Sequence, residues 1–190
     1  DSTMSQVKVL SKASGEEFDA LRDKARQLGK DTPHSATEAA EGMAILAAAG
    51  LETNQILGST EHMLNLMSAG ATDSTTSAKI LTTAFTQFGL KGTAEDAERV
   101  ADAFTMGAKS ANTNVGELQE AFRMGGSALS NMNMSVEDSM AMFDVMAQGA
   151  IVGSQAGTTV SAMARDITAN ADKFKEFGIN VYDSTGQARG

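Results

Sequence analysis

The sequence predicts an all-α fold of about eight short helices, arranged either as helical hairpins or as an irregular bundle. Helix-capping residues recur about every 20 residues, and apolar residues follow them at intervals of three and four, the spacing of one helix face. One proline and 18 glycines among 190 residues favour many helix ends. Because 42% of the residues are hydrophobic, the chain can bury a core.

Each expected helix begins at a residue whose side chain can accept a hydrogen bond from the exposed N–H groups of the first turn. Ser35 and Glu38 have the spacing of a capping box. In a capping box each of the two side chains accepts a hydrogen bond from the backbone N–H of the other residue. Glycines follow several of the apolar runs and predict helix ends. The expected starts are Ser14, Ser35, Thr53, Asp73, Thr93, Asn114, Ser135 and Ser154.

These starts form two interleaved sets with a period near 40 residues. Ser14, Thr53, Thr93 and Ser135 are separated by 39, 40 and 42 residues, and Ser35, Asp73, Asn114 and Ser154 by 38, 41 and 40. The spacing predicts four helix–turn–helix units of about 40 residues, within the range of α-helical repeats. A plain bundle of eight short helices would give the same rhythm, so both arrangements stay open.

We expect three segments along the chain. Residues 1–13 form a flexible or added N-terminal segment, and residues 14–172 form one helical core domain. Residues 173–190 form a short, truncated β-hairpin, because Phe177–Tyr182 alternate loosely between apolar and polar and Asp183–Gly186 has the composition of a turn.

Charge and motif content argue against several classes of function. The net charge of −9 disfavours nucleic-acid binding, and the absence of cysteine excludes disulfides and thiolate metal sites. Neither His34 nor His62 lies in a metal-binding pattern, and the acidic run from Glu95 to Asp102 reads as a solvated helix face. No phosphate-binding glycine loop or serine-nucleophile motif is present. We therefore expect no enzyme activity, no metal and no cofactor.

The longest uncharged window, residues 145–164, is long enough to cross a bilayer. It contains Gly149, Gly153 and Gly157 in a tandem GxxxG pattern, which is typical of packed membrane helices. Its glutamine, serine and threonine residues are unfavourable in lipid. We therefore expect two helices instead, one ending near Gly149 and one beginning near Ser154.

Twelve methionines form a further compositional feature. Methionine fills irregular cores and also lines surfaces that bind other helices. Core filling is the favoured interpretation, and a methionine-lined groove for another protomer or a partner is the alternative. The candidate partner-surface residues are Met124, Met132, Met134, Met140, Met142 and Met146.

Several blocks of the sequence resemble one protein family. They are Phe18–Gly29 (FDALRDKARQLG), Ser35–Met43 (SATEAAEGM), Asp96–Asp102 (DAERVAD), Gly153–Thr158 (GSQAGT) and Phe177–Asp183 (FGINVYD). In this order they resemble the TP901-type core region of phage tail tape measure proteins, in the phage-related minor tail protein family, over about residues 14–189. The family-motif residues, with a structural role, are Gly149, Gly153, Ser154, Gln155, Gly157 and Thr158.

The resemblance implies a structural virion protein that occupies the tail tube lumen and, during assembly, the host cytoplasm. It implies roles in tail assembly, tail length determination and genome ejection. The implied partners are other copies of the chain, tail tube proteins, tail tip or baseplate proteins, and tail assembly chaperones. Two alternatives stay open: a helical-repeat adaptor, and a membrane-active segment, based on residues 145–164, that acts on the host envelope during ejection.

Overall fold

The computed structural model describes residues 2–110 and 113–189, and the chain divides into two compact units, Asp1–Thr105 and Met106–Gly190. We call them unit 1 and unit 2. Within the described residues there are ten helices and no β-strand, so the predicted all-α class is confirmed.

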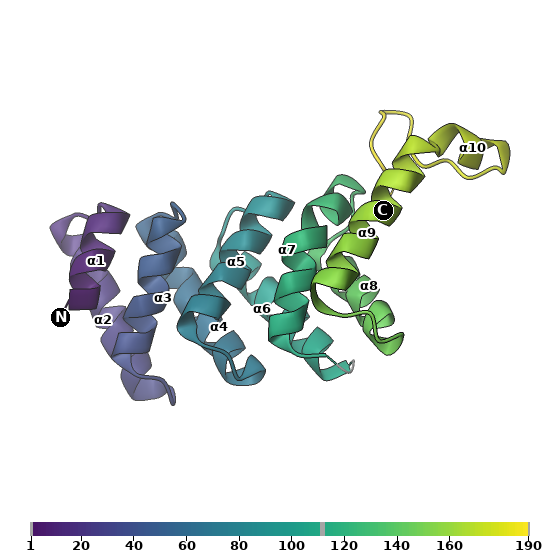
Figure 1. The fold of residues 1–190 in the computed structure, drawn as a ribbon. Helices are drawn as coiled ribbons and strands as arrows, with labels where there is room; N and C mark the ends of the chain where they lie inside the picture. The colour runs from purple at the N-terminus through teal and green to yellow at the C-terminus, as the bar shows by residue number, and fades with distance from the viewer. Residues whose placement is uncertain (1, 111–112, 190) are drawn as a thin grey trace. The chain divides into compact units, whose positions relative to one another are not determined.

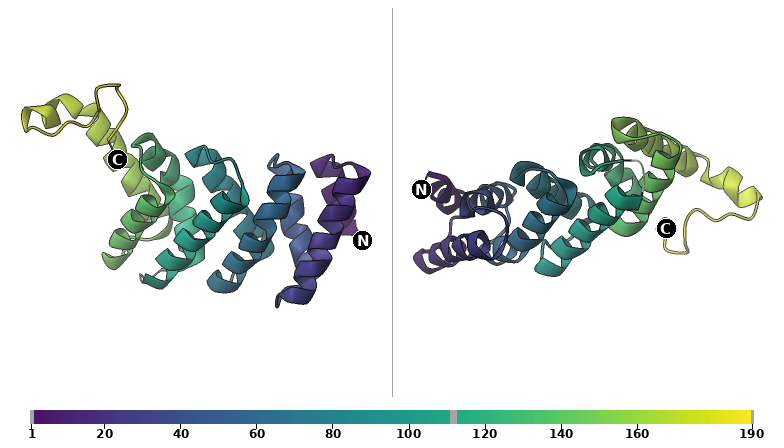
Figure 2. Two further views of the ribbon diagram at one scale, coloured as in Figure 1. Left: turned by 180° about the vertical axis from the view of Figure 1, so that it is seen from behind. Right: turned by 90° about the horizontal axis from the view of Figure 1, so that it is seen from below.

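Unit 1 is built from two layers of helices. Its helices are α1 (Ser2–Ser11), α2 (Gly15–Asp31), α3 (Ala36–Ala48), α4 (Thr53–Gly70), α5 (Ser74–Phe88) and the first part of α6 (Ala94–Ser110). The helices α1, α3 and α5 pack side by side in one layer, and α2 packs beside α4 in the other (Figure 1; Figure 2). Because α3 also contacts both α2 and α4, consecutive helices from α2 to α5 alternate between layers, as in stacked helical hairpins.

Unit 2 repeats this alternation with the remaining helices. They are the end of α6, then α7 (Val115–Asn131), α8 (Val136–Gln148), α9 (Gly153–Ala169) and α10 (Ala171–Glu176). The helices α7 and α9 pack closely side by side, and α8 contacts both. The buried rings of Phe122 and Phe143 join α7 to α8, with their centroids 6.5 Å apart in an edge-to-face arrangement.

Local capping chemistry explains most of the helix starts. Six of the eight expected cap residues accept a hydrogen bond from the first turn of the helix that follows: Ser14, Ser35, Asp73, Thr93, Asn114 and Ser135. The other two expected caps, Thr53 and Ser154, lie inside the first turns of α4 and α9. The N-cap positions of these helices are held by Glu52 and Val152. The helix starts Ala36, Ser74, Val115 and Gly153 are 38, 41 and 38 residues apart, which confirms the predicted period.

The described residues contain two helices more than the expected eight. One additional helix, α1, lies within residues 1–13, where we expected a flexible segment. It packs on α3 and buries Met4 and Val7, three residues apart on one helix face. The other is the short α10, which occupies part of the expected hairpin segment.

The predicted C-terminal β-hairpin is wrong. Its expected first strand begins at the end of α10, where the Ile179 N–H donates to the Phe174 carbonyl at 3.0 Å and Gly178 has φ of +77°. A single antiparallel bridge joins Tyr182 and Ala188. Between them Asp183 accepts hydrogen bonds that shape a turn. Because two isolated strands have little stability in water, the segment instead buries Val181 and Ala188 and keeps an irregular backbone.

Candidate functional site

The family-motif glycine at position 157 is a contact point between α9 and α7. A Cβ atom on Gly157 would overlap the carbonyl oxygen of Ala121 and would lie 2.6 Å from the Met124 Cβ. On the opposite side, a Cβ atom on Gly125 would lie 3.0 Å from the Gly157 carbonyl oxygen and 3.2 Å from the Phe143 ring. Glycine at both positions therefore lets the two backbones approach closely.

A side-chain hydrogen bond supports the same contact. The Ser161 hydroxyl on α9 donates to the Met124 carbonyl on α7 at 2.8 Å. In sequence, Ala121 and Gly125 are four residues apart, as are Gly157 and Ser161, so each helix brings a pair of small residues to the contact. Sequence reasoning missed Gly125, although its spacing from Ala121 was a usable signal.

The other family-motif residues do not share this contact. Gly149 caps the end of α8, and Gly153, with φ of +58°, begins α9. Ser154 and Thr158 are exposed on the first turns of α9, where the Thr158 hydroxyl donates to the Ser154 carbonyl at 2.7 Å. Gln155 is also exposed. The tandem glycines therefore serve two helix ends and one helix–helix contact.

The uncharged window of residues 145–164 is divided between α8 and α9, with a break from Gly149 to Val152. This confirms the two-helix interpretation of the window. Among the helices of the described ranges, none combines the length and the apolar character needed to span a membrane.

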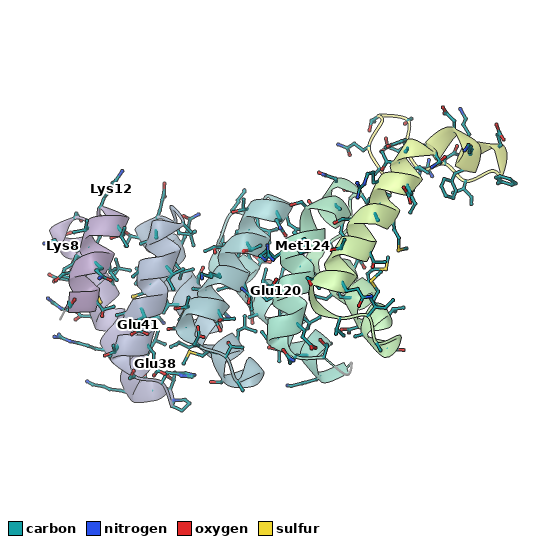
Figure 3. All side chains as sticks on the ribbon, viewed as in Figure 1. Lys8, Lys12, Glu38, Glu41, Glu120 and Met124 are labelled. Carbon is teal, nitrogen blue, oxygen red and sulfur yellow. The ribbon has the colours of Figure 1, made fainter. Side chains whose placement is uncertain are left out.

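The six candidate methionines fall into four structural groups. Met140 is a core residue at 3% exposure, whereas Met124 on α7 is 42% exposed (Figure 3). Met132, Met134 and Met142 line a cavity of about 60 Å³ between α7, α8 and α9. Met146 is half-buried on α8.

Sequence reasoning missed other residues that line the small cavity between α7, α8 and α9. Two of them are Met163 and Ile167 of α9. They also line a second, more open cavity of about 410 Å³, together with Phe174 of α10 and Phe177. Asp166 and Lys173 border that second cavity, and Phe177 is 82% exposed. The α8–α9–α10 region therefore carries a continuous apolar surface with one acidic and one basic side chain at its border.

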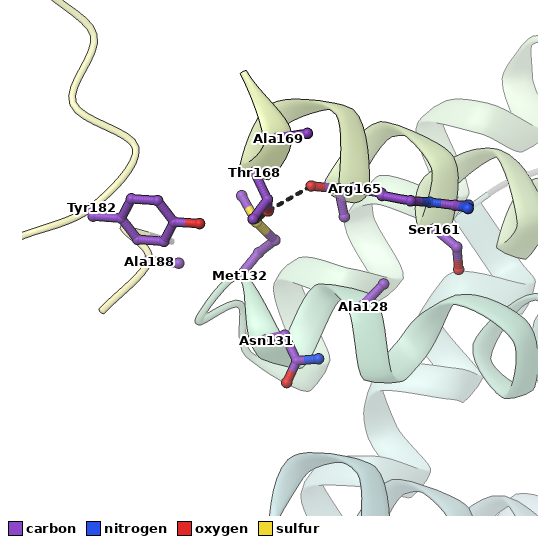
Figure 4. Close-up of a pocket in the computed structure, with 10 residues that line it drawn as sticks. Ala128, Asn131, Met132, Ser161, Arg165, Thr168, Ala169, Tyr182 and Ala188 are labelled. Atoms are coloured by element: carbon purple, nitrogen blue, oxygen red, sulfur yellow. Dashed lines mark hydrogen bonds between the residues drawn. The ribbon is translucent and has the colours of Figure 1, made fainter. Parts of the chain in front are cut away.

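A third cavity, of about 440 Å³, lies where the C-terminal segment crosses α7 and α9 (Figure 4). Tyr182 and Ala188 face Met132 and Thr168 across it, and Arg165 is the charged side chain in its wall. The Thr168 hydroxyl is within hydrogen-bonding distance of the Ala164 carbonyl, at 2.7 Å. Small apolar and hydroxyl side chains dominate this cavity, and nothing in it resembles a nucleophile paired with a base.

The titratable groups with shifted pKa values have structural roles. The Ser35 backbone N–H, and then its hydroxyl, lower the pKa of Glu38, and Ser14 lowers the pKa of Glu17 in the same way. The Arg123 side chain, 2.8 Å away, lowers the pKa of Glu120 through its hydrogen bond and its charge. In the part of the chain that the structure describes, no three histidine, aspartate or glutamate side chains gather as metal ligands would.

The fold is a series of short helices packed in layers within each unit, and the glycines of the family motif serve helix ends and a helix–helix contact. Comparison with known proteins gives its family. The model of the phage-related minor tail protein family matches residues 22–190, and the chain belongs to this family.

Two curated relatives carry tape measure names. The chain is 33% identical over 187 residues to the tape measure protein of Pneumococcus phage Dp-1, covering 96% of this chain and 16% of that protein. It is 29% identical over 177 residues to the probable tape measure protein of Escherichia phage P2, covering 91% of this chain and 22% of that protein. The chain thus spans less than a quarter of the length of either relative. No solved structure matches it.

Proposed function

We propose that this chain is a folded helical domain of a phage tail tape measure protein and acts in tail assembly, tail length determination and genome ejection. The observation that carries the proposal is the 33% identity to the Dp-1 tape measure protein across 96% of the chain. The role is structural and non-enzymatic. Its supporting features are layered helices, glycine-mediated helix contacts and an apolar surface on unit 2.

The proposed location is the lumen of the tail tube in the virion, and the host cytoplasm during assembly. The proposed partners are other copies of the chain, tail tube proteins, tail tip or baseplate proteins, and tail assembly chaperones. The apolar surface that includes Met142 and Met163 offers a contact area for such proteins. The net charge of −9 is compatible with a lumen that DNA must later pass through.

The domain is proposed to work as a folded unit, and not as a stretch of extended ruler. A ruler made of one continuous helix gains about 1.5 Å per residue. Among the described residues the longest helix, α4, has 18 residues, and the layered helices bury apolar side chains against their neighbours. Extending the chain would expose those side chains to water at a large cost in free energy.

Deleting one helical hairpin from the encoding phage tests this proposal. Removal of residues 14–52 takes out α2 and α3, on which α1 and α4 pack. If the domain works as a folded unit, the deletion should leave few infectious particles. The tails of the particles that do form should keep their length. An extended ruler predicts viable particles whose tails are shorter by about 60 Å, from about 1.5 Å per residue over about 40 residues. Electron microscopy and plaque counts give both readouts.

Two point variants control this experiment. Gly157→Ala should weaken the fold without shortening the chain, so it should reduce infectivity and leave tail length unchanged. Gly15→Ala places its new methyl group in open space and should behave like the parent phage. Infectious tails that shorten in proportion to the deletion would contradict the proposal.

A further inference from the structure

A cavity of about 360 Å³ lies within unit 1, between α1, α2 and α3. Both α1 and α2 pack on α3, and the Lys8 ammonium of α1 lies 5.2 Å from the centre of the Phe18 ring of α2 (Figure 3). That contact joins α1 to α2 at one end. The cavity lies toward the other end, where Thr3 of α1 and Arg22 of α2 share its wall.

The wall of this cavity combines a buried apolar floor with hydrogen-bond donors. The floor residues are Met4, Ala25 and Ala40. The hydroxyl groups in the wall belong to Ser2, Thr3 and Thr37. Two guanidinium groups complete it, from Arg22 and Arg26, one helical turn apart on α2. Among the described residues that line the cavity, none is acidic.

The Arg22 guanidinium is only partly paired. Its Nη2 lies 2.9 Å from Asp19 Oδ1. Its Nε lies 3.7 Å from Asp23 Oδ1, too far for a hydrogen bond, and is buried without a hydrogen-bond partner in the described part of the chain. A buried donor on a charged group is costly to leave unpaired. Arg22 therefore favours an acceptor that the described residues do not supply.

We propose that this cavity binds a phosphate group, as inorganic phosphate or on a small phosphate monoester. Guanidinium groups present paired N–H donors that match the oxygen atoms of phosphate. Because the donors come from three helices on different sides of the cavity, they suit a tetrahedral phosphate better than a planar carboxylate. The volume is at the small end of the range for ligand pockets, which leaves room for a phosphate and a small organic group.

The neighbouring carboxylates limit the affinity and do not block the site. Asp19 and Asp23 balance the charges of the two arginines, so we expect modest affinity. Their side chains are 57% and 69% exposed, and exposed ion pairs contribute little to stability. A phosphate can therefore compete for the guanidinium donors. The Arg22 side chain is itself 37% exposed, so a small rotation can turn its Nε–H toward the ligand.

Phosphate titration of the 190-residue protein, followed by nuclear magnetic resonance, tests the proposal. Inorganic phosphate and glycerol 1-phosphate are each compared with acetate and with sodium chloride at equal ionic strength. The expected result is a saturable shift of the Arg22 Nε–H signal with phosphate, and a much smaller shift with acetate or chloride. Saturation by inorganic phosphate and not by the monoester would support the free ion as the ligand. An unchanged signal, or an equal response to all four, would overturn the proposal.

Variants at the arginines test the site itself, with binding measured from the backbone amide signals of Thr3 and Thr37. Arg22→Lys keeps the charge and loses the paired donors, so it should weaken phosphate binding about tenfold or more. Arg26→Lys, at a side chain that is 60% exposed, should also weaken binding and keep the fold. The matched control is Arg123→Lys in unit 2, where the arginine pairs with Glu120 and does not line the cavity. It should leave phosphate binding unchanged.

Removal of a competing carboxylate should have the opposite effect. Asp23 lies 3.7 Å from the Arg22 Nε and 3.8 Å from the Arg26 Nη1, so Asp23→Asn should tighten phosphate binding about fivefold. Asp31→Asn removes the same charge from an exposed position at the end of α2 and controls for net charge. Arginine variants that bind as tightly as the parent, or Asp23→Asn binding no more tightly than Asp31→Asn, would overturn the proposal.

Phosphate binding at this cavity is independent of the proposed role in the tail. Its absence would leave the tail-length experiment unaffected, and tails that shorten in proportion to the deletion would leave the phosphate titration unaffected.

Discussion

Replacement of Gly157 by alanine should destabilise unit 2 through the contact between α7 and α9. Its new Cβ atom would lie 2.6 Å from the Met124 Cβ and would overlap the Ala121 carbonyl oxygen. Carbon atoms pack at about 3.5–4.0 Å, so the two helices must separate by about 1 Å. Because Ala121 opposes the methyl group with backbone atoms, rotamer changes alone cannot relieve the overlap.

The expected loss is about 2 kcal/mol of unfolding free energy. Overpacking in a core costs about 1–3 kcal/mol, and the backbone overlap places this site near the upper end. Alanine is more favourable than glycine within a helix by about 1 kcal/mol, which offsets part of the cost. For a unit of this size, about 2 kcal/mol corresponds to a decrease of roughly 10 °C in the melting temperature.

Urea and thermal unfolding followed by far-UV circular dichroism measure this change. Gly125→Ala, with its nearest contacts at 3.0–3.2 Å, should lose less stability than Gly157→Ala. Gly15→Ala, where nothing lies within 4 Å of the new methyl group, should lose none. A Gly157→Ala protein as stable as the parent would refute the close packing of α7 and α9.

Three further predictions concern the core, a helix cap and the C-terminal segment. Phe143→Ala should cost about 3–5 kcal/mol in urea unfolding, because the ring is 1% exposed and packs edge-to-face on Phe122. Glu38→Gln should flatten the acid side of the stability–pH profile. The pKa of Glu38 is lowered in the folded protein, so its stabilisation is present above the usual glutamate pKa near 4.5 and is lost as pH falls through the lower folded value. Asp183→Ala should speed proteolysis and amide exchange after Lys175, because its carboxylate accepts hydrogen bonds from the Thr185 hydroxyl at 2.7 Å and the Gln187 N–H at 3.0 Å.

The helical content and the repeat were predictable because their signals are local. A cap such as Ser35 acts on an N–H three residues away, so the sequence around it is enough to place the helix start. The same reasoning failed for α1, because the contact of Met4 and Val7 with α3 had no visible counterpart in the sequence. It failed in the C-terminal segment because weak alternation resembled a strand, whereas the described residues there form α10 and a single bridge between Tyr182 and Ala188.

The candidate site was predicted only in part. The methionines and the Gly153–Thr158 block were identified, yet Met140 is a core residue, Met142 lines a small cavity, and Met163 was missed. These three residues have the same side chain and similar surroundings in sequence. Their burial depends on which helices cover them, and those helices lie tens of residues away along the chain.

The sequence by itself determined the helical class, most helix starts, the 40-residue period and the family. Only the tertiary structure decided that Gly157 packs against the backbone of α7 opposite Gly125, and that Met140 is buried whereas Met163 is exposed. The physical reason is range: caps and turns depend on hydrogen bonds within about four residues, whereas burial depends on apolar surfaces that only folding brings together.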